Sequence, residues 1–219
     1  MECGESRKSD GRWDGTMKLH WSPRSPFVRK VMVVAHEVGL VDKLTLVRTV
    51  AASTRPHAEL MRDNPLSKIP TLVLDDGRPL YDSPVICEYL DQLHTGPKLF
   101  PVEPEARFAA LRRQALGDGL LDLLILSRDE RMRQHSSDVH LASYATRRKT
   151  TLAAMNAEVD QLSVAPFSIG HIAIGCALGY LDFRFASEDW RQDHPQLARW
   201  HADFSARPSV RNTEPIDDS

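Results

Sequence analysis

The most constraining feature of the sequence is an Ile-Pro dipeptide followed by a short apolar run. Twelve positions after the proline comes an acidic residue followed by a serine. The first element is Asn64-Pro-Leu-Ser-Lys-Ile-Pro70, and the pair is Asp82-Ser83 at the start of a helical pattern. An X-Pro bond adopts cis far more readily than other peptide bonds, so we expect Pro70 to turn the Ile69 backbone outward before Thr71 enters a sheet. The Ile69 N–H and C=O would then pair with a ligand backbone, as an added strand does.

The helix start at Asp82-Ser83 predicts a charged end for the same ligand. Ser83 and the first free amides of a helix favour an anion, because unpaired N–H groups and the helix dipole are both positive there. The Asp82 carboxylate favours an ammonium group. A molecule with an amino group and a carboxylate at one end, and a peptide amide further along, satisfies all three features, and glutathione has this pattern.

A second motif gives the chain a family resemblance. Ser22 to Val31 reads Ser-Pro-Arg-Ser-Pro-Phe-Val-Arg-Lys-Val. This stretch resembles the bacterial members of the glutathione transferase superfamily that open with Ser-Pro-x-Ser-Pro-[Phe/Tyr]-Val-Arg-Lys-Val. The resemblance runs from about Met17 to about Arg211.

The order of periodic segments predicts an α/β domain followed by an all-α domain. The first, thioredoxin-like domain has a four-stranded mixed sheet with helices on both faces. Its expected elements are strands 18–21, 44–50, 71–74 and 79–81 and helices 25–39, 56–64 and 83–94. The second domain is expected to contain helices 104–134, 138–162, 168–185 and 195–206, with 168–185 buried at its centre. The expected organisation is a disordered extension 1–16, a glutathione-binding domain 17–95, a linker 96–103, a helical domain 104–211 and a tail 212–219.

Composition excludes several classes of protein. Thirty acidic and twenty-eight basic residues give a net charge of -2, so nothing directs the chain to nucleic acid or anionic lipid. No apolar run reaches the roughly 20 residues of a membrane span, and residues 1–16 lack the apolar core of a signal peptide, which favours a cytoplasmic protein. The three cysteines, Cys3, Cys87 and Cys176, are widely spaced, so we expect neither a disulfide framework nor a metal site, and we expect Cys87 and Cys176 to be core residues.

Two serines are the candidate catalytic residues. A free thiol has a pKa of about 8.5, and lowering it by two units requires about 2.7 kcal/mol of preference for the thiolate. A hydroxyl donor at the positive end of a helix supplies such a preference, and Ser22 and Ser25 flank the turn before the first helix. Ser25 is also a good N-cap, because Pro26 follows it. The position of the catalytic serine or cysteine in several classes of the superfamily falls on Arg24, which either stabilises a thiolate by its charge or blocks the pocket.

The resemblance implies roles for the remaining candidates. Ile69 before Pro70 would pair with the cysteinyl backbone of glutathione, Ser83 would bind the γ-glutamyl carboxylate beside Asp82, and Lys68 would reach the glycine carboxylate. The electrophile would lie between the domains, lined by Phe27 and the helix after Pro104. The resemblance further implies a homodimer that conjugates reduced glutathione, as co-substrate, to a hydrophobic electrophile in detoxification. The charge balance, the length of the apolar runs and the residue spacing predict no nucleic acid, membrane or metal as partner.

Two other functions stay open. One is glutathione-dependent reduction of a disulfide or peroxide, which is disfavoured because no cysteine lies in the first turn. The other is a non-enzymatic binding module, which Arg24 and His171 favour. His171 stands where members of the superfamily commonly carry an acid that completes a capping box with Ser168. Because protonated histidine cannot accept that hydrogen bond, we expect stability to fall below about pH 6.5, by roughly 1 kcal/mol relative to His171→Asp.

Overall fold

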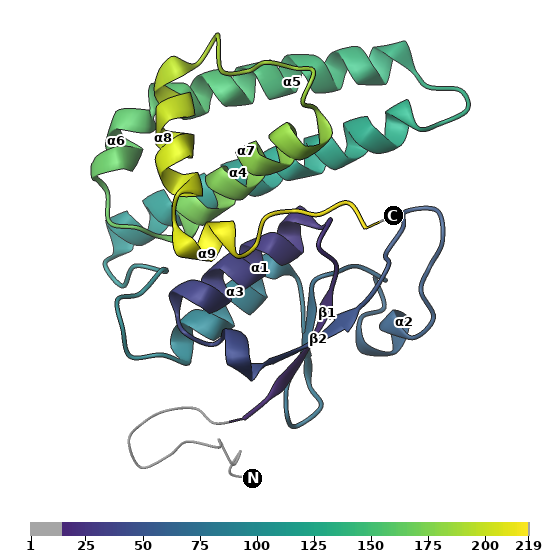
Figure 1. Cartoon of the computed structure of the whole chain (residues 1–219), viewed down its shortest axis with the longest axis vertical. Coiled ribbons are helices and arrows are strands. Elements are labelled where there is room, and N and C mark those ends of the chain that lie inside the picture. Colours follow the sequence, from purple (N-terminus) through teal and green to yellow (C-terminus); the bar gives the residue numbers. More distant parts are fainter. Residues whose placement is uncertain (1–14, 219) are drawn as a thin grey trace. The chain divides into compact units, whose positions relative to one another are not determined.

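The computed structural model describes residues 15–218 of the 219-residue chain. The fold divides into two compact units, Met1–Phe100 together with Thr213–Ser219, and Pro101–Asn212 (Figure 1). Cys3 and the larger part of the expected extension 1–16 lie outside the described residues. The short C-terminal segment therefore packs with the first unit, although the second unit precedes it in the chain.

The first unit contains a four-stranded mixed sheet with the strand order β2-β1-β3-β4. Strand β1 pairs in parallel with β2 and antiparallel with β3, which in turn forms the expected hairpin with β4. The order strand-helix-strand-helix-strand-strand-helix, typical of a thioredoxin-like domain, is confirmed. The elements are β1 (Met17–Trp21), α1 (Pro26–Glu37), a 3-10 turn (Val41–Lys43), β2 (Leu44–Arg48), α2 (Leu60–Asp63), β3 (Thr71–Val73), β4 (Pro79–Leu80) and α3 (Ser83–Gln92).

Helices cover both faces of this sheet. Helices α1 and α3 lie side by side on one face, and α2 lies on the other side of the strands (Figure 1). The alternation along β1 explains the arrangement, because successive strand side chains point to opposite faces. Lys18 and His20 both reach Asp63 of α2, whereas Leu19 between them is fully buried.

Helix α2 is shorter than the sequence predicts. The expected helix 56–64 is reduced to Leu60–Asp63, and the preceding residues form turns. Hydrogen bonds from loop side chains hold those turns: His57 donates its backbone N–H to Ser67 Oγ at 2.8 Å, and His57 Nδ1 accepts from the Leu60 N–H at 3.2 Å. Hydrogen bonding to the loop before Pro70 thus holds residues 56–59 outside the helix, which begins only at Leu60.

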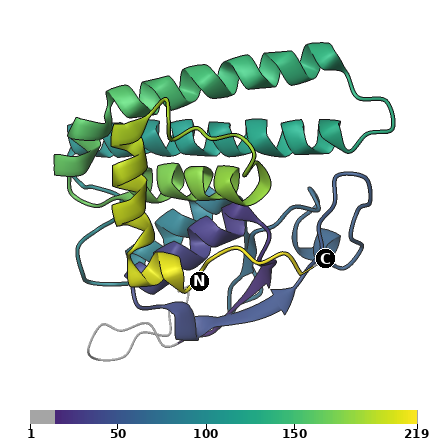
Figure 2. The same ribbon diagram turned by 45° about the horizontal axis from the view of Figure 1, so that its top comes forward.

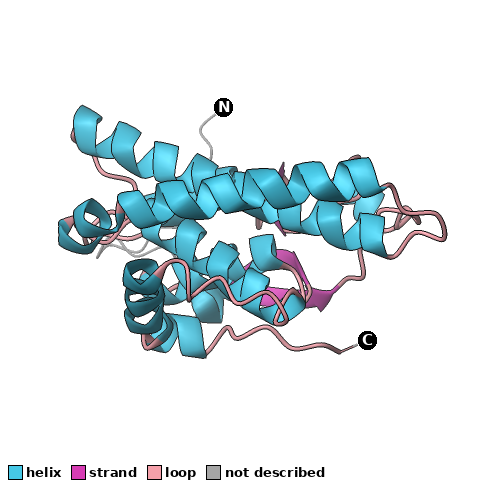
Figure 3. Cartoon of the chain, turned by 90° about the horizontal axis from the view of Figure 1, so that it is seen from above, coloured by secondary structure: helices cyan, strands magenta, loops and turns pink. Residues whose placement is uncertain are grey.

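The second unit contains helices and no strand within its residues 101–212, all of which the structure describes (Figure 3). The expected single helix 138–162 is wrong, because the chain breaks it at Glu158. At this break the Glu158 carboxylate accepts two hydrogen bonds from Arg112, at 2.7 and 2.5 Å. The helices are α4 (Pro104–Arg131), α5 (Asp138–Ala157), α6 (Val159–Val164), α7 (Ile169–Arg184), α8 (Pro195–Ser205) and α9 (Pro208–Arg211).

Helix α7 is the buried centre of the second unit, as predicted. Almost every residue from Ile169 to Leu181 is buried. Its backbone lies close to Gly117 of α4, where an added Cβ would lie 2.5 Å from the Ala173 backbone. Only glycine permits two helices to pack this closely at that position. Among residues 15–218, no helix is long and apolar enough to cross a membrane.

Candidate functional site

The strand register brings most of the predicted site residues to one edge of the sheet. His20 of β1 pairs with Thr71 of β3, so one further step places Trp21, the last residue of β1, beside Pro70. Leu72 pairs with Leu80, so the same continuation places Asp82 beside Pro70 from the other side. The turn after β1, the Ile69–Pro70 step and the start of α3 therefore meet at this edge.

The Ile69–Pro70 peptide bond is cis, as the sequence predicts. Ile69 is half-buried, and Pro70 is buried. No hydrogen bond joins the Ile69 backbone to another group among the described residues 15–218. Because backbone N–H and C=O groups need partners, this position offers one donor and one acceptor to an extended ligand.

Asn64 holds the loop that presents Ile69, a role that sequence reasoning missed. Its side chain is 1% exposed. The Asn64 Nδ2 donates to the Lys68 carbonyl at 3.1 Å and to Thr71 Oγ1 at 2.9 Å, and its Oδ1 accepts from the Leu66 N–H at 3.0 Å. One amide thus fixes both sides of the loop; the available signal was its place at the beginning of the 64–70 motif.

Helix α3 begins at Ser83, as the sequence predicts, with Asp82 as its N-cap residue and Ser83 buried. Pro84 has no N–H, so the free amides of this first turn are those of Ser83 and Val85. These two donors and the helix dipole favour a carboxylate at this end of α3, beside the exposed Asp82 side chain.

The two candidate catalytic serines differ in environment. Ser25 caps α1, with its Oγ accepting from the Val28 N–H at 3.3 Å, and is half-buried. The cap uses only a lone pair, so the Ser25 O–H is able to donate to a ligand. Ser22 is 5% exposed, and its Oγ accepts from the Arg24 N–H at 3.4 Å within the turn. Ser25 is therefore the more accessible donor.

Arg24 and two residues that sequence reasoning missed form an ion-pair cluster beside these serines. Arg24 Nε lies 3.0 Å from Asp218 Oδ1, and Arg48 Nε donates to Asp218 Oδ2 at 2.8 Å. Nothing in the sequence pattern links position 48 or 218 to this turn. Lys68 is exposed, and Phe27 is half-buried with Lys30 Nζ 5.7 Å from its ring centroid.

Ion pairs and hydrogen bonds hold α2 to strand β1, next to the predicted site. Asp63 accepts hydrogen bonds from Lys18 Nζ at 2.6 Å and pairs with His20 Nε2 at 2.8 Å. These two partners, Lys18 first, hold the pKa of the Asp63 carboxyl below its ordinary value. The ionised carboxylate therefore ties the residue before Asn64 to strand β1.

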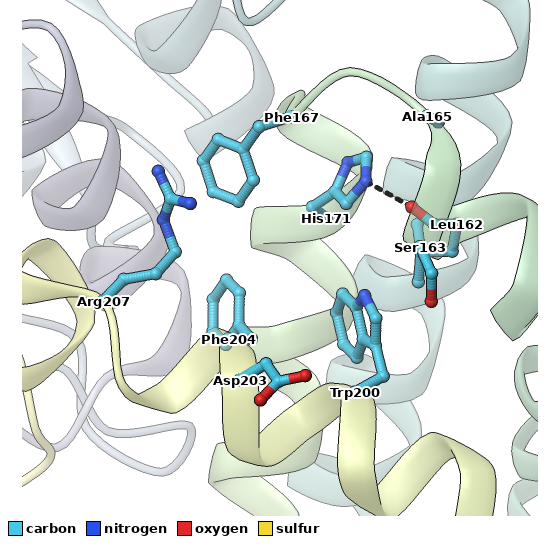
Figure 4. Close-up of a pocket in the computed structure, with 9 residues that line it drawn as sticks. All are labelled: Leu162, Ser163, Ala165, Phe167, His171, Trp200, Asp203, Phe204 and Arg207. Carbon is cyan, nitrogen blue, oxygen red and sulfur yellow. Dashed lines mark hydrogen bonds between the residues drawn. The ribbon is translucent and has the colours of Figure 1, made fainter.

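A separate cavity of about 300 Å³ lies within the second unit, where aromatic side chains of α8 face the start of α7 (Figure 4). His171 lines it: Nδ1 accepts from the Ser168 N–H at 3.1 Å, and Nε2 faces the Leu162 carbonyl oxygen at 2.9 Å. The expected capping role of His171 as an acceptor is confirmed. Burial lowers the pKa of His171, and the charges of Arg113 and Arg207 act in the same direction.

The cysteines and the arrangement of possible metal ligands can be stated for the described part of the chain. Cys87 and Cys176 are fully buried, as predicted for core residues. Across residues 15–218, no group of three or more His, Cys, Asp or Glu side chains is arranged to hold a metal ion.

Comparisons with known proteins agree with this geometry. Residues 24–93 match the family described as glutathione S-transferase, N-terminal domain, and residues 138–203 match glutathione S-transferase, C-terminal domain. The chain is 32% identical to the uncharacterized GST-like protein YibF of Escherichia coli K12, over 91% of this chain and 98% of the relative.

Two solved structures extend the comparison to bound ligands. A glutathione transferase family member from Pseudomonas fluorescens Pf-5 with bound glutathione is 42% identical, with a TM-score of 0.89 over 92% of this chain and 100% of the other. A structure of a family member from the same organism with bound S-(propanoic acid)-glutathione is 40% identical, with a TM-score of 0.85 and the same coverage.

Proposed function

Because the chain belongs to the glutathione S-transferase superfamily, we propose that it binds reduced glutathione and conjugates it to an electrophilic small molecule. The observation that carries this proposal is the unpaired backbone of Ile69 beside a cis proline, at the same sheet edge as the amides that begin α3. Glutathione bound to a relative that is 42% identical over nearly the whole chain supports the same ligand.

In this proposal each group meets one part of the tripeptide. The Ile69 N–H and C=O pair with the cysteinyl backbone, and the first-turn amides and hydroxyl of Ser83 bind the γ-glutamyl carboxylate. Asp82 takes the γ-glutamyl ammonium group, and Lys68 reaches the glycine carboxylate. The cysteinyl sulfur then faces the turn after β1.

The chemical step depends on the thiolate, because a thiol is a poor nucleophile. The Ser25 O–H donates to the sulfur, and the positive end of α1 and the Arg24 guanidinium favour its negative charge. In conjugation the thiol proton leaves to solvent and the sulfur forms a bond to the electrophilic carbon, which either releases a leaving group with its electron pair or, at an activated double bond, passes the π electron pair to the neighbouring carbon, where a proton from water is added. The propanoic-acid thioether of glutathione bound by a relative has the form of such a product.

The ultraviolet absorption of the thiolate tests this assignment. We expect glutathione added to the protein to show a thiolate band at neutral pH, and Ser25→Ala to lose it together with at least tenfold in conjugation rate. Ser137→Ala is a matched control, because Ser137 caps α5 in the same way, accepting from the His140 N–H at 3.4 Å. If Ser25→Ala keeps the band and the rate, Ser25 is not the donor, and Ser22→Ala then tests the other serine.

A binding module without turnover is the second candidate, and the ion pair that holds Arg24 at Asp218 favours it. Glutathione binding measured by calorimetry without any thiolate band would support the module over the enzyme. The proposal also includes a cytoplasmic homodimer, as in the family. Light scattering coupled to gel filtration tests the dimer, and a mass of one chain at micromolar concentration would reject it.

A further inference from the structure

Two arginines meet at the carboxyl ends of adjacent parallel strands. Arg48 is the last residue of β2, and the parallel register pairs it with Trp21, the last residue of β1. Arg24 lies in the turn that follows β1, immediately before the Ser25 cap of α1. Ligands of open α/β sheets bind at the carboxyl ends of strands, and the positive end of a helix adds to two guanidinium charges there.

Carboxylates of the chain itself lie at this position: Asp218 binds both arginines, and Asp217 Oδ1 lies 4.0 Å from Arg24 Nη1. Asp218 Oδ1 lies 3.0 Å from Arg24 Nε, and Asp218 Oδ2 lies 2.8 Å from Arg48 Nε and 2.5 Å from Arg48 Nη2. Each oxygen of one carboxylate thus faces a different guanidinium. Figure 2 shows the segment after α9, in yellow, running along the first unit, with which it packs.

The Asp218 carboxylate is placed so that another carboxylate is able to displace it from the two arginines. The side chains of Arg24, Arg48 and Asp218 are 25%, 35% and 30% exposed, so water reaches each ion pair and an incoming carboxylate is able to compete for the two arginines. The Arg48 side chain also makes a hydrogen bond that does not involve Asp218, because its Nη1 donates to the Thr49 carbonyl at 3.2 Å. Arg48 therefore keeps its position when the carboxylate between the two arginines is replaced.

We propose that Arg24 and Arg48 form a carboxylate clamp that selects electrophiles carrying a carboxylate, and that Asp218 occupies the clamp when no such molecule is bound. This inference rests on the proposed function, since it names the class of the second substrate. The class it fits best is an α,β-unsaturated carboxylic acid.

The clamp also fits the charge that develops in that reaction. The thiolate sulfur forms a bond to the β-carbon, the π electron pair moves onto the α-carbon and its carboxylate, and the α-carbon then takes a proton from water. Negative charge on the carboxylate increases before that proton arrives. Two guanidinium groups directed at its oxygens stabilise this more highly charged state more than they stabilise the singly charged carboxylate of the bound substrate, as catalysis requires.

Calorimetric binding to three compounds tests the clamp without requiring turnover: glutathione, S-(propanoic acid)-glutathione and the matching propanamide thioether, which lacks the added charge. We expect the wild-type protein to prefer the acid over the amide by roughly tenfold, as for one charge-assisted hydrogen-bonded pair. Arg48→Gln should abolish the preference. Asp218→Asn should tighten binding of the acid several-fold and leave binding of the amide unchanged.

Glu214→Gln is the matched control, because it removes a carboxylate from the same exposed segment and should behave as the wild-type protein. If the acid and the amide bind equally to the wild-type protein and to Asp218→Asn, the clamp is wrong while glutathione binding stands. If glutathione itself does not bind, the proposed function fails first. The two failures are therefore distinguishable in one set of titrations.

Discussion

The capping histidine of the buried helix makes the stability of this protein depend on pH. His171 is 5% exposed, and its neutral form satisfies two backbone groups: Nδ1 accepts from the Ser168 N–H, and Nε2–H donates to the Leu162 carbonyl. A proton on Nδ1 would remove the acceptor and place a positive charge at the positive end of α7. Two arginines that already lower the pKa of His171 oppose that charge as well.

The sign and size of the effect follow from proton linkage. The pKa of His171 is lower in the folded protein than its ordinary value of 6.5. Its contribution to stability is therefore complete above pH 6.5 and decreases as pH falls below that value, because only the unfolded chain takes up the proton. If the folded site stays neutral, the loss between pH 7.5 and 5.5 is about 1.4 kcal/mol, which lowers Tm by about 3–5 °C for a chain of this size.

Melting curves of the wild-type protein and of His171→Asp at both pH values measure this loss. The carboxyl of an aspartate, with an ordinary pKa of about 3.9, does not titrate in this window, so the variant should lose about 1.4 kcal/mol less than the wild-type protein. Comparing the two slopes removes the effects of the other eight histidines and of the smaller side chain. If the free energy of unfolding falls equally between pH 7.5 and 5.5 in both proteins, the reasoning is refuted, whatever their absolute stabilities are.

Three further substitutions test the packing around the site and the helical core. Asn64→Ala should lower the free energy of unfolding by about 2–3 kcal/mol and weaken glutathione binding at least tenfold, since it removes the amide that holds the 64–70 loop. Urea titration measures the first effect and calorimetry the second. An unchanged affinity for glutathione would show that Asn64 contributes to folding alone. Gly175→Ala should cost about 1–3 kcal/mol, because its Cβ would lie 2.2 Å from the Phe204 ring, and Phe204→Leu in the same chain should recover part of the loss; a neutral single substitution would contradict this packing. Asp63→Asn should cost about 1–2 kcal/mol at pH 7, where the carboxylate is fully ionised, and a urea midpoint equal to that of the wild-type protein would show that its two basic partners contribute nothing.

Local signals in the sequence determined the order of elements and the framework of the site. Ser25 followed by Pro26 marks a helix start whatever surrounds it, because capping and a preset φ are properties of neighbouring residues. The cis bond at Pro70 and the buried helix from Ile169 were predictable for the same reason, one from the chemistry of proline and the other from an apolar run.

Contacts between distant residues decided the rest. Helix 138–162 is divided at Glu158, whose carboxylate pairs with Arg112, 46 positions away, and no periodicity within the helix records that partner. The Asn64 amide acquires its role only when the 64–70 loop folds back on itself. Arg48 and Asp218, 170 positions apart, meet because parallel strand pairing fixes one and the return of the chain to the first unit fixes the other. Charge and spacing along the chain identify candidates, but which of them share a site depends on register and packing, which exist only in three dimensions.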